Sequence, residues 1–277
     1  MSGAIWLASY PKSGNTWARL ALRSLRDGGD AILLDDALTF GGLNATHGMM
    51  DRWLEVESGH LTADEIDALR PDYHALFFGG SAPRVCKVHD AWVRNAEGRP
   101  FFDPGFTHAA LYILRDPRDV AVSWSRFAGR TLDDTVTMLA DPLGQLSTPP
   151  GRGKTQLRQR MGSWSAHVTS WVDDSNLSPL VIRYEDMLAD TPGTLRQMVG
   201  HIGWRIDTAA IAGAVEATRF ERLADQERRH GFRERADRTE RFFHTGVAGG
   251  WRDILTPEQV ARIERDHAAV MRRFGYL

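Results

Sequence analysis

The chain has 277 residues, of which 42% are hydrophobic and 25% charged, as in an ordinary globular protein with one sizeable core. Its formal net charge is −2 at neutral pH. Nucleic-acid and membrane-surface binders are normally clearly basic, so this charge argues against both classes.

The cysteine content and the N-terminus point to the cytoplasm. Cys86 is the only cysteine, so no intrachain disulfide can form, which is usual in a reducing compartment. The first residues lack a basic region followed by a long apolar stretch, so we expect no signal peptide. No apolar run approaches the roughly 20 residues of a membrane-spanning helix. The sequence therefore predicts a cytoplasmic protein without membrane insertion.

Buried strands alternate with helices along the chain. Apolar runs bounded by turn residues predict strands at 5–8 and 110–114, and weaker runs predict strands at 84–88 and 180–183. After the strands at 5–8 and 110–114, apolar residues recur at helical spacing, from residue 16 and from residue 117. Further helical patterns occupy residues 63–69, 194–202, 208–217 and 258–274. This order, without an internal repeat, predicts a single α/β domain over residues 1–277, with a central parallel sheet flanked by helices.

Two stretches lack a clear periodic pattern. Residues 131–160 contain few large apolar side chains and a Pro-Pro-Gly sequence at 149–151, which favours a mobile loop or lid. Residues 219–241 are rich in arginine, which is typical of a solvated helix face. The alternative is that residues 219–245 cover an active site.

A tight polar turn, Tyr-Pro-Lys-Ser-Gly-Asn-Thr-Trp at residues 10–17, joins the first strand to its helix. Its amides, the helix dipole and Lys12 can converge on an anion. A plain connection capped by Thr16 is the alternative. Lys12 precedes the glycine, whereas the Walker lysine follows it. A near-match at residues 153–155 (Gly-Lys-Thr) lacks the earlier glycine and a preceding strand, which weakens a kinase interpretation.

A second basic turn follows the second strand, at residues 115–123. Arg115 ends the strand, and Ser123 lies two turns into the following helix, so both can face one crevice. A bidentate cation and a hydroxyl there are suited to a second phosphate group. The alternative is that Arg115 pairs with Asp116 or Asp119 at the helix start.

Acid–base candidates end the strand at 84–88. Alternation places Lys87 and His89 on the same side, towards the strand's end. A histidine can be neutral at cytoplasmic pH, so it suits the role of a base. Cys86 could be a nucleophile, but its apolar surroundings favour a core residue.

The turn at residues 10–17 resembles the 5′-phosphosulfate loop of cytosolic sulfotransferases that use 3′-phosphoadenosine 5′-phosphosulfate (PAPS). That loop usually reads Tyr-Pro-Lys-Ser-Gly-Thr-Thr-Trp, and only Asn15 differs. The resemblance implies a fold like that of P-loop nucleotide kinases, contact of Lys12 with the sulfate and bridging oxygen, and stacking of Trp17 on adenine unless it is a core residue. The residues expected to hold the 5′-phosphate are Ser13, Gly14, Asn15 and Thr16.

The second turn is similar to the 3′-phosphate motif of the same family, in which an arginine and a serine eight positions later bind that group. Arg115 and Ser123 match both positions. The extra phosphate separates PAPS from ATP, so this match favours a sulfotransferase over a kinase.

The family has Lys-Thr-His where this chain has Lys-Val-His at residues 87–89. The match implies that His89 deprotonates the acceptor, while Lys87 and Lys12 stabilise the sulfuryl oxygens and the leaving phosphate. Ser123 completes the set of catalytic candidates.

Later matches are looser. Tyr184, Thr218 and Phe220 resemble adenine contacts of the family, with ordinary packing as the alternative for each. The family's Arg-Lys-Gly loop, which also binds the 3′-phosphate, aligns with His244, Thr245 and Gly246.

This chain therefore lacks the arginine and the lysine that the family has in that loop. Arg241 or another nearby arginine is the expected substitute. The family's dimer motif is not recognisable around residues 256–257, so the oligomeric state stays open.

The sequence thus predicts transfer of a sulfuryl group from PAPS to a hydroxyl of a small-molecule acceptor, by in-line displacement without a metal. The alternatives are a nucleotide-dependent kinase of similar fold and a non-catalytic nucleotide-binding protein. The acceptor is open. Residues that line its pocket, or else belong to the core, are Phe40, His47, Met49, Met50 and Trp53.

Overall fold

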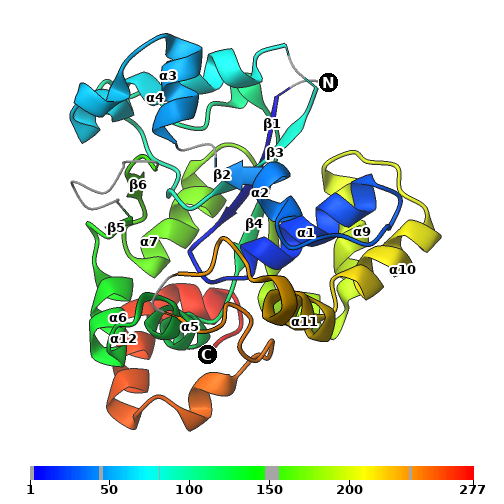
Figure 1. The fold of residues 1–277 in the computed structure, drawn as a ribbon. Helices are drawn as coiled ribbons and strands as arrows, with labels where there is room; N and C mark the ends of the chain where they lie inside the picture. The colour runs from blue at the N-terminus through cyan, green and yellow to red at the C-terminus, as the bar shows by residue number, and fades with distance from the viewer. Residues whose placement is uncertain (1–2, 44–45, 81, 147–155, 237–238) are drawn as a thin grey trace.

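Five parallel strands form the central sheet of the computed structural model, which describes residues 3–43, 46–80, 82–146, 156–236 and 239–277 (Figure 1). Their spatial order is β2-β3-β1-β4-β7, and every neighbouring pair is parallel. The strands are β1 (Ala4–Ser9), β2 (Gly41–Leu43), β3 (Arg84–Val88), β4 (Thr107–Leu114) and β7 (Leu180–Arg183). The predicted α/β fold with a central parallel sheet is confirmed.

Helices cover both faces of this sheet (Figure 1). The helices are α1 (Asn15–Arg26), α2 (Asp36–Thr39), α3 (His47–Leu54), α4 (Ala63–Phe78), α5 (Pro117–Ala128), α6 (Leu132–Ala140), α7 (Trp164–Thr169), α8 (Tyr184–Ala189), α9 (Thr191–His201), α10 (Thr208–Ala217), α11 (Phe220–His230) and α12 (Pro257–Arg273). A short antiparallel pair, β5 (Gln145–Leu146) and β6 (Gln159–Arg160), lies apart from the main sheet. Within the described ranges, no helix combines the length and apolar character needed to cross a bilayer.

The alternation of side chains along the strands divides the core in two. Trp6 of β1 and Tyr112 of β4 point to the face covered by α5, α6, α7 and α12. Leu7 and Leu111, one residue along each strand, point to the face covered by α1, α9 and α10. Because both faces are buried, the two strands read as continuous apolar runs, which is how they were recognised.

The stretch 131–160 was predicted as a loop, and for residues 132–140 this is wrong. They form α6, whose first turn is capped by the Thr131 side chain, which accepts a hydrogen bond from the backbone of Asp134. Val136 and Leu139 bury one side of the helix. Leu132 and Met138, which are partly buried, pack against the same core and complete the apolar side of this short helix. Residues 147–155, with the Pro-Pro-Gly and Gly-Lys-Thr sequences, lie outside the described residues.

The arginine-rich stretch begins as α11, which buries Leu223 and Glu227. Arg222, Arg228 and Arg229 are exposed, so the predicted solvated helix face is confirmed for this helix. Beyond it, residues 233–234 and 242–246 line the cavity that is described below. We call residues 231–236 and 239–246 the covering segment.

Candidate active site

A cavity of about 1130 Å³ opens at the carboxyl ends of β1, β3 and β4. In an open parallel sheet this edge gathers the loops that follow the strands. All of the residues predicted to act in catalysis or to bind the donor, except Ser13, line this cavity, and Ser13 is buried within the first turn. The lining candidates are Lys12, Gly14, Asn15, Thr16, Trp17, Lys87, His89, Arg115, Ser123, Tyr184, Thr218, Phe220, His244, Thr245 and Gly246.

The first turn has the backbone of an anion cradle. Gly14 precedes α1 with φ 104°, and a Cβ atom there would lie 2.6 Å from the ring of Tyr184. Lys12 also adopts a positive φ, 69°, which is uncommon for a residue with a side chain. The first N–H groups of α1 have no partner within the helix, so they are available to an anion.

Asn15 differs from the threonine of the family loop, and its side chain is used inside the turn. The Nδ2 group donates to the carbonyl of Leu7 at 2.9 Å and to Ser9 Oγ at 3.2 Å. The amide therefore fastens the turn to the end of β1. What Asn15 can offer an anion in this arrangement is its backbone N–H.

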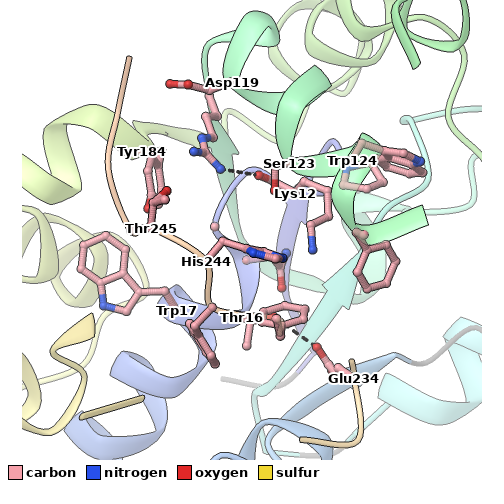
Figure 2. A pocket seen from close by; sticks show the side chains of 18 of the residues that line it. Lys12, Thr16, Trp17, Asp119, Ser123, Trp124, Tyr184, Glu234, His244 and Thr245 are labelled. Carbon is pink, nitrogen blue, oxygen red and sulfur yellow. Dashed lines mark hydrogen bonds between the residues drawn. The ribbon is translucent and has the colours of Figure 1, made fainter. Parts of the chain in front are cut away.

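The two basic turns are joined directly. Arg115 Nη1 donates to the carbonyl oxygen of Lys12 at 3.0 Å, and its guanidinium lies 4.3 Å from the centre of the Tyr184 ring (Figure 2). The alternative pairing of Arg115 with the helix-start carboxylates does not occur. Asp116 binds Arg118 instead, and Asp119 accepts backbone hydrogen bonds from residues 249 and 251.

The two lysines share a crowded cationic region. The Lys12 ammonium lies 4.0 Å from the centre of the Phe127 ring and 4.3 Å from that of Phe242. Burial, with Lys87 and Arg115 nearby, lowers the pKa of Lys12 to about 7. Burial also lowers the pKa of Lys87, to about 8. Both ammonium groups therefore lose protons far more readily than an exposed lysine.

His89 is held as a neutral imidazole. Its Nδ1 atom lies 2.9 Å from the carbonyl oxygen of Ser9, a contact that requires a proton on Nδ1. Burial, and then the charge of Lys87, depress the pKa of His89 well below its usual value. The Nε2 lone pair is therefore free to accept a proton, as the base role demands.

Sequence reasoning missed Glu234 and Arg19. Glu234 of the covering segment accepts a hydrogen bond from Thr16 Oγ1 at 3.1 Å (Figure 2). The same carboxylate lies 3.5 Å from Lys87 Nζ. Arg19, fully buried in α1, donates to both carboxylate oxygens at 2.7 Å. The available signal was an arginine within the apolar pattern of the first helix.

The adenine candidates lie together. Trp17 and Tyr184 meet edge to face with their ring centres 5.8 Å apart. The Thr218 hydroxyl donates to the carbonyl of Ala214 at 2.7 Å, so its side chain is engaged within its own helix. Phe220 packs beside Phe243, with ring centres 6.3 Å apart.

Residues 244–246, which we call the third loop and which align with the family's Arg-Lys-Gly loop, line the cavity but lack the two cations of that loop. His244 lines the cavity, and burial, followed by Arg126 and Lys12, lowers its pKa. It is therefore a neutral side chain where the family has a cation. Arg241 does not line the cavity, whereas Arg126 of α5 does.

The suggested acceptor-pocket residues do not line this cavity. Phe40 and Met50 belong to the hydrophobic core, the His47 ring bonds Ser58, and Trp53 packs on Phe77. The side chains found instead are Leu38, Trp124, Leu146, Gln156 and Gln159. Gln159 is only 2% exposed, and its Oε1 atom has no hydrogen-bond partner among the described residues.

Cys86 is buried, and burial raises the pKa of its thiol to about 12, so its assignment to the core is confirmed. In the part of the chain that the structure describes, no three histidine, cysteine or acidic side chains are grouped as metal ligands. Whether the reaction needs a metal stays a prediction.

Comparisons with known proteins agree on one family. The family model described as a sulfotransferase domain matches residues 2–275. The sulfotransferase 2A2 of Mus musculus is 23% identical over 265 residues, which are 94% of this chain and 81% of the mouse protein. The sulfotransferase 2A6 of Rattus norvegicus is 25% identical over 275 residues, with the same shares covered.

Solved structures share the fold. Mouse sulfotransferase SULT7A1 complexed with PAP has a TM-score of 0.59 at 20% identity, covering 98% of this chain and 85% of the other. A retinol dehydratase in complex with androsterone and inactive cofactor PAP has a TM-score of 0.63 at 19% identity, covering 97% and 80%.

Proposed function

The chain belongs to the sulfotransferase domain family, and from this premise we propose that it transfers a sulfuryl group from PAPS to a hydroxyl of a small-molecule acceptor. The observation that carries the proposal is the hydrogen bond from Arg115 to the Lys12 carbonyl, which unites the two anion-binding turns in one cavity. A nucleotide with phosphate at both its 5′ and 3′ positions is the ligand that needs both turns.

The cavity suits the donor in charge and shape. Lys12, Lys87 and Arg115 supply cations, and the start of α1 supplies backbone donors for the 5′-phosphosulfate. Trp17 and Tyr184 supply the aromatic surface that adenine needs. Membership of the sulfotransferase family argues against the kinase alternative.

The reaction follows from these roles. His89 Nε2 takes the proton of the acceptor hydroxyl while the acceptor oxygen attacks the sulfur atom. The bond between sulfur and the bridging oxygen breaks on the opposite side, and 3′,5′-adenosine bisphosphate (PAP) leaves with the electron pair. Lys12 and Lys87 neutralise the charge that develops on the sulfuryl oxygens and the leaving phosphate. The proton on His89 then passes to solvent.

Arg126 takes the place of the missing cation of the third loop. It lies three residues after Ser123 in α5, so both occupy the same side of the helix, and it lines the cavity beside His244. Ser123, Arg115 and Arg126 together hold the 3′-phosphate.

The part of the cavity proposed to hold the acceptor is lined by apolar side chains and by the buried amide of Gln159. Leu38, Trp124 and Leu146 favour a hydrophobic acceptor body. The N–H of Ala91, two residues after His89, donates to the carbonyl of Arg160 at 2.7 Å. This hydrogen bond holds the backbone of β6 close to His89. The neighbouring Gln159 Oε1 atom, buried and without a partner among the residues that the structure describes, accepts a hydrogen bond from a second polar group of the acceptor.

The proposal is tested with labelled PAPS. The protein is incubated with the donor and a panel of phenols, alcohols and glycosides, and PAP and ATP binding are compared by calorimetry. Labelled sulfate should appear on at least one acceptor, and PAP should bind far more tightly than ATP. Binding of ATP without binding of PAP would contradict the proposal.

A further inference from the structure

Glu234 has no role in the reaction above, yet it contacts two residues of the donor site. Its Oε2 atom accepts a hydrogen bond from Thr16 (Figure 2) and lies 3.5 Å from the Lys87 ammonium. The carboxylate comes from the covering segment, 218 residues after Thr16 in the chain. A negative charge inside a site built for an anionic donor needs an explanation.

Arg19 explains how the charge is tolerated. The Glu234 side chain is 15% exposed and that of Arg19 is fully buried, so each would be costly without the other. Arg19 also donates to the carbonyl of Ala37 at 2.5 Å and to Thr16 Oγ1 at 3.2 Å. These contacts fix the guanidinium, and the guanidinium fixes the Glu234 carboxylate.

The Glu234 carboxylate stabilises the charged form of Lys87. Among the hydrogen bonds of the described residues, the one that its ammonium donates goes to Glu234. The other charged groups that act on Lys87 from neighbouring elements, Arg19 and Lys12 of the first turn and helix, are cations, and the adjacent His89 is neutral. Glu234 is thus the anion that opposes deprotonation of Lys87.

We propose that Glu234 is a positioning residue, which keeps Lys87 protonated and directed at the donor site, and that Arg19 holds the Glu234 carboxylate for this purpose. The inference rests on the proposed function, because it takes the donor to be the anion that Lys87 serves.

The sign of the effect depends on pH. Burial lowers the pKa of Lys87 to about 8 although Glu234 raises it, so removal of Glu234 brings this pKa below 8. At about pH 8.5 Lys87 is mostly neutral both in the wild type and in a variant without the carboxylate, but the lysine of the variant has the lower pKa, so it takes up its proton at a greater cost and the variant binds an anion more weakly. At about pH 6 Lys87 is protonated with or without Glu234, and the variant also lacks a negative charge that repels the ligand. The variant then binds PAP as tightly as the wild type or more tightly.

The test is calorimetry of PAP binding to wild type and Glu234→Gln at these two pH values. We expect affinity about tenfold lower in the variant at the higher pH, the loss of one charge-assisted contact, and no loss at the lower pH. Titrations in two buffers of different ionisation enthalpy at about pH 7.5, just below the wild-type pKa of Lys87, should show that the variant takes up more protons on binding PAP.

The matched control is Glu240→Gln, which removes the same charge from an exposed side chain of the covering segment. It should bind PAP like the wild type at both pH values. In a Lys87→Met background, Glu234→Gln should change the pH dependence much less, because only the weaker effect of Glu234 on Lys12 remains. Glu234→Asp keeps the charge opposite Arg19 with a shorter reach, and should show the same effect at smaller amplitude.

An equal loss of affinity at both pH values in the Glu234 variants would assign them a merely structural role and overturn the inference. Persistence of the pH effect at its full size in the Lys87→Met background would overturn it as well. If the wild type itself fails to bind PAP at either pH, the proposed function is wrong, and this inference is then wrong for that reason.

Discussion

The Nδ1 atom of His89 lies 2.9 Å from the carbonyl oxygen of Ser9, and this contact fixes the tautomer of the proposed base. With the proton on Nδ1, the Nε2 atom has a free lone pair. We therefore expect His89→Ala to lower kcat by about 100-fold or more. PAP affinity, measured by calorimetry, should change by less than about threefold, because a neutral ring contributes little to anion binding. His60→Ala, at an exposed site outside the cavity, is the control. Near-normal turnover of His89→Ala would reject the assignment.

The pH dependence of kcat/KM for PAPS should be set by lysines rather than by the histidine. The pKa of His89 lies well below 6.5, so the base is already neutral at about pH 6, and no rise in activity is expected between about pH 6 and 7. The pKa of Lys12 is about 7 and that of Lys87 about 8, so cationic charge is lost as the pH rises through this window. We expect kcat/KM for PAPS to fall across it. Initial-rate measurements that instead rise towards pH 8 would contradict the prediction.

The strands and helices of this fold were predictable because buried positions carry apolar residues, in continuous runs for strands covered on both faces and at helical spacing for helices. The apolar runs that became β1 and β4 are continuous since both faces of the sheet are covered, and the parallel arrangement then brings Lys12 and Arg115 to the same edge. The pairing of Arg19 with Glu234 spans 215 residues and follows no period, so the sequence held no signal for the partner. Helix α6 was missed because it is short and only Val136 and Leu139 of its large apolar side chains are fully buried, while Leu132 and Met138 are buried in part.

Arg115 should distinguish PAP from nucleotides without a 3′-phosphate. Arg115→Ala is expected to weaken PAP binding about 10- to 100-fold and AMP binding much less, since the guanidinium serves the extra phosphate. Arg126→Ala should give a smaller loss in the same direction. Arg130→Ala, an exposed arginine just beyond α5, is the matched control and should have no effect. Calorimetry with both nucleotides measures the difference, and an equal loss for PAP and AMP would place Arg115 elsewhere than at the 3′-phosphate.

Gly14 should be intolerant of a side chain for two separable reasons. Its φ of 104° is strained for alanine, and the added Cβ atom would lie 2.6 Å from the Tyr184 ring. Gly14→Ala should therefore lower the melting temperature by a few degrees, for about 1–2 kcal/mol, and weaken PAP binding about tenfold or more. Gly28 has a φ of 78° and nothing within 4 Å of an added Cβ atom. Gly28→Ala shares the backbone strain alone, so it should lose stability and keep its PAP affinity. Equal PAP affinities in the two variants would show that the Tyr184 contact does not shape the site.

Gln159 should determine which acceptors are used. Its buried amide oxygen has no hydrogen-bond partner in the described part of the chain, which favours a ligand that donates to it, and sites of this kind reject analogues that lack the donor. Wild type should prefer a diol, such as catechol or trans-1,2-cyclohexanediol, to its monomethyl ether by about tenfold or more in kcat/KM. Gln159→Leu should remove this preference while leaving PAP binding intact, because Leu fills the space without an acceptor atom. Gln145→Leu changes the same residue type on the neighbouring strand, outside the cavity, and should preserve the preference. If Gln159→Leu lowers the turnover of diols and ethers alike, the amide supports the fold of β6 rather than recognition of the acceptor.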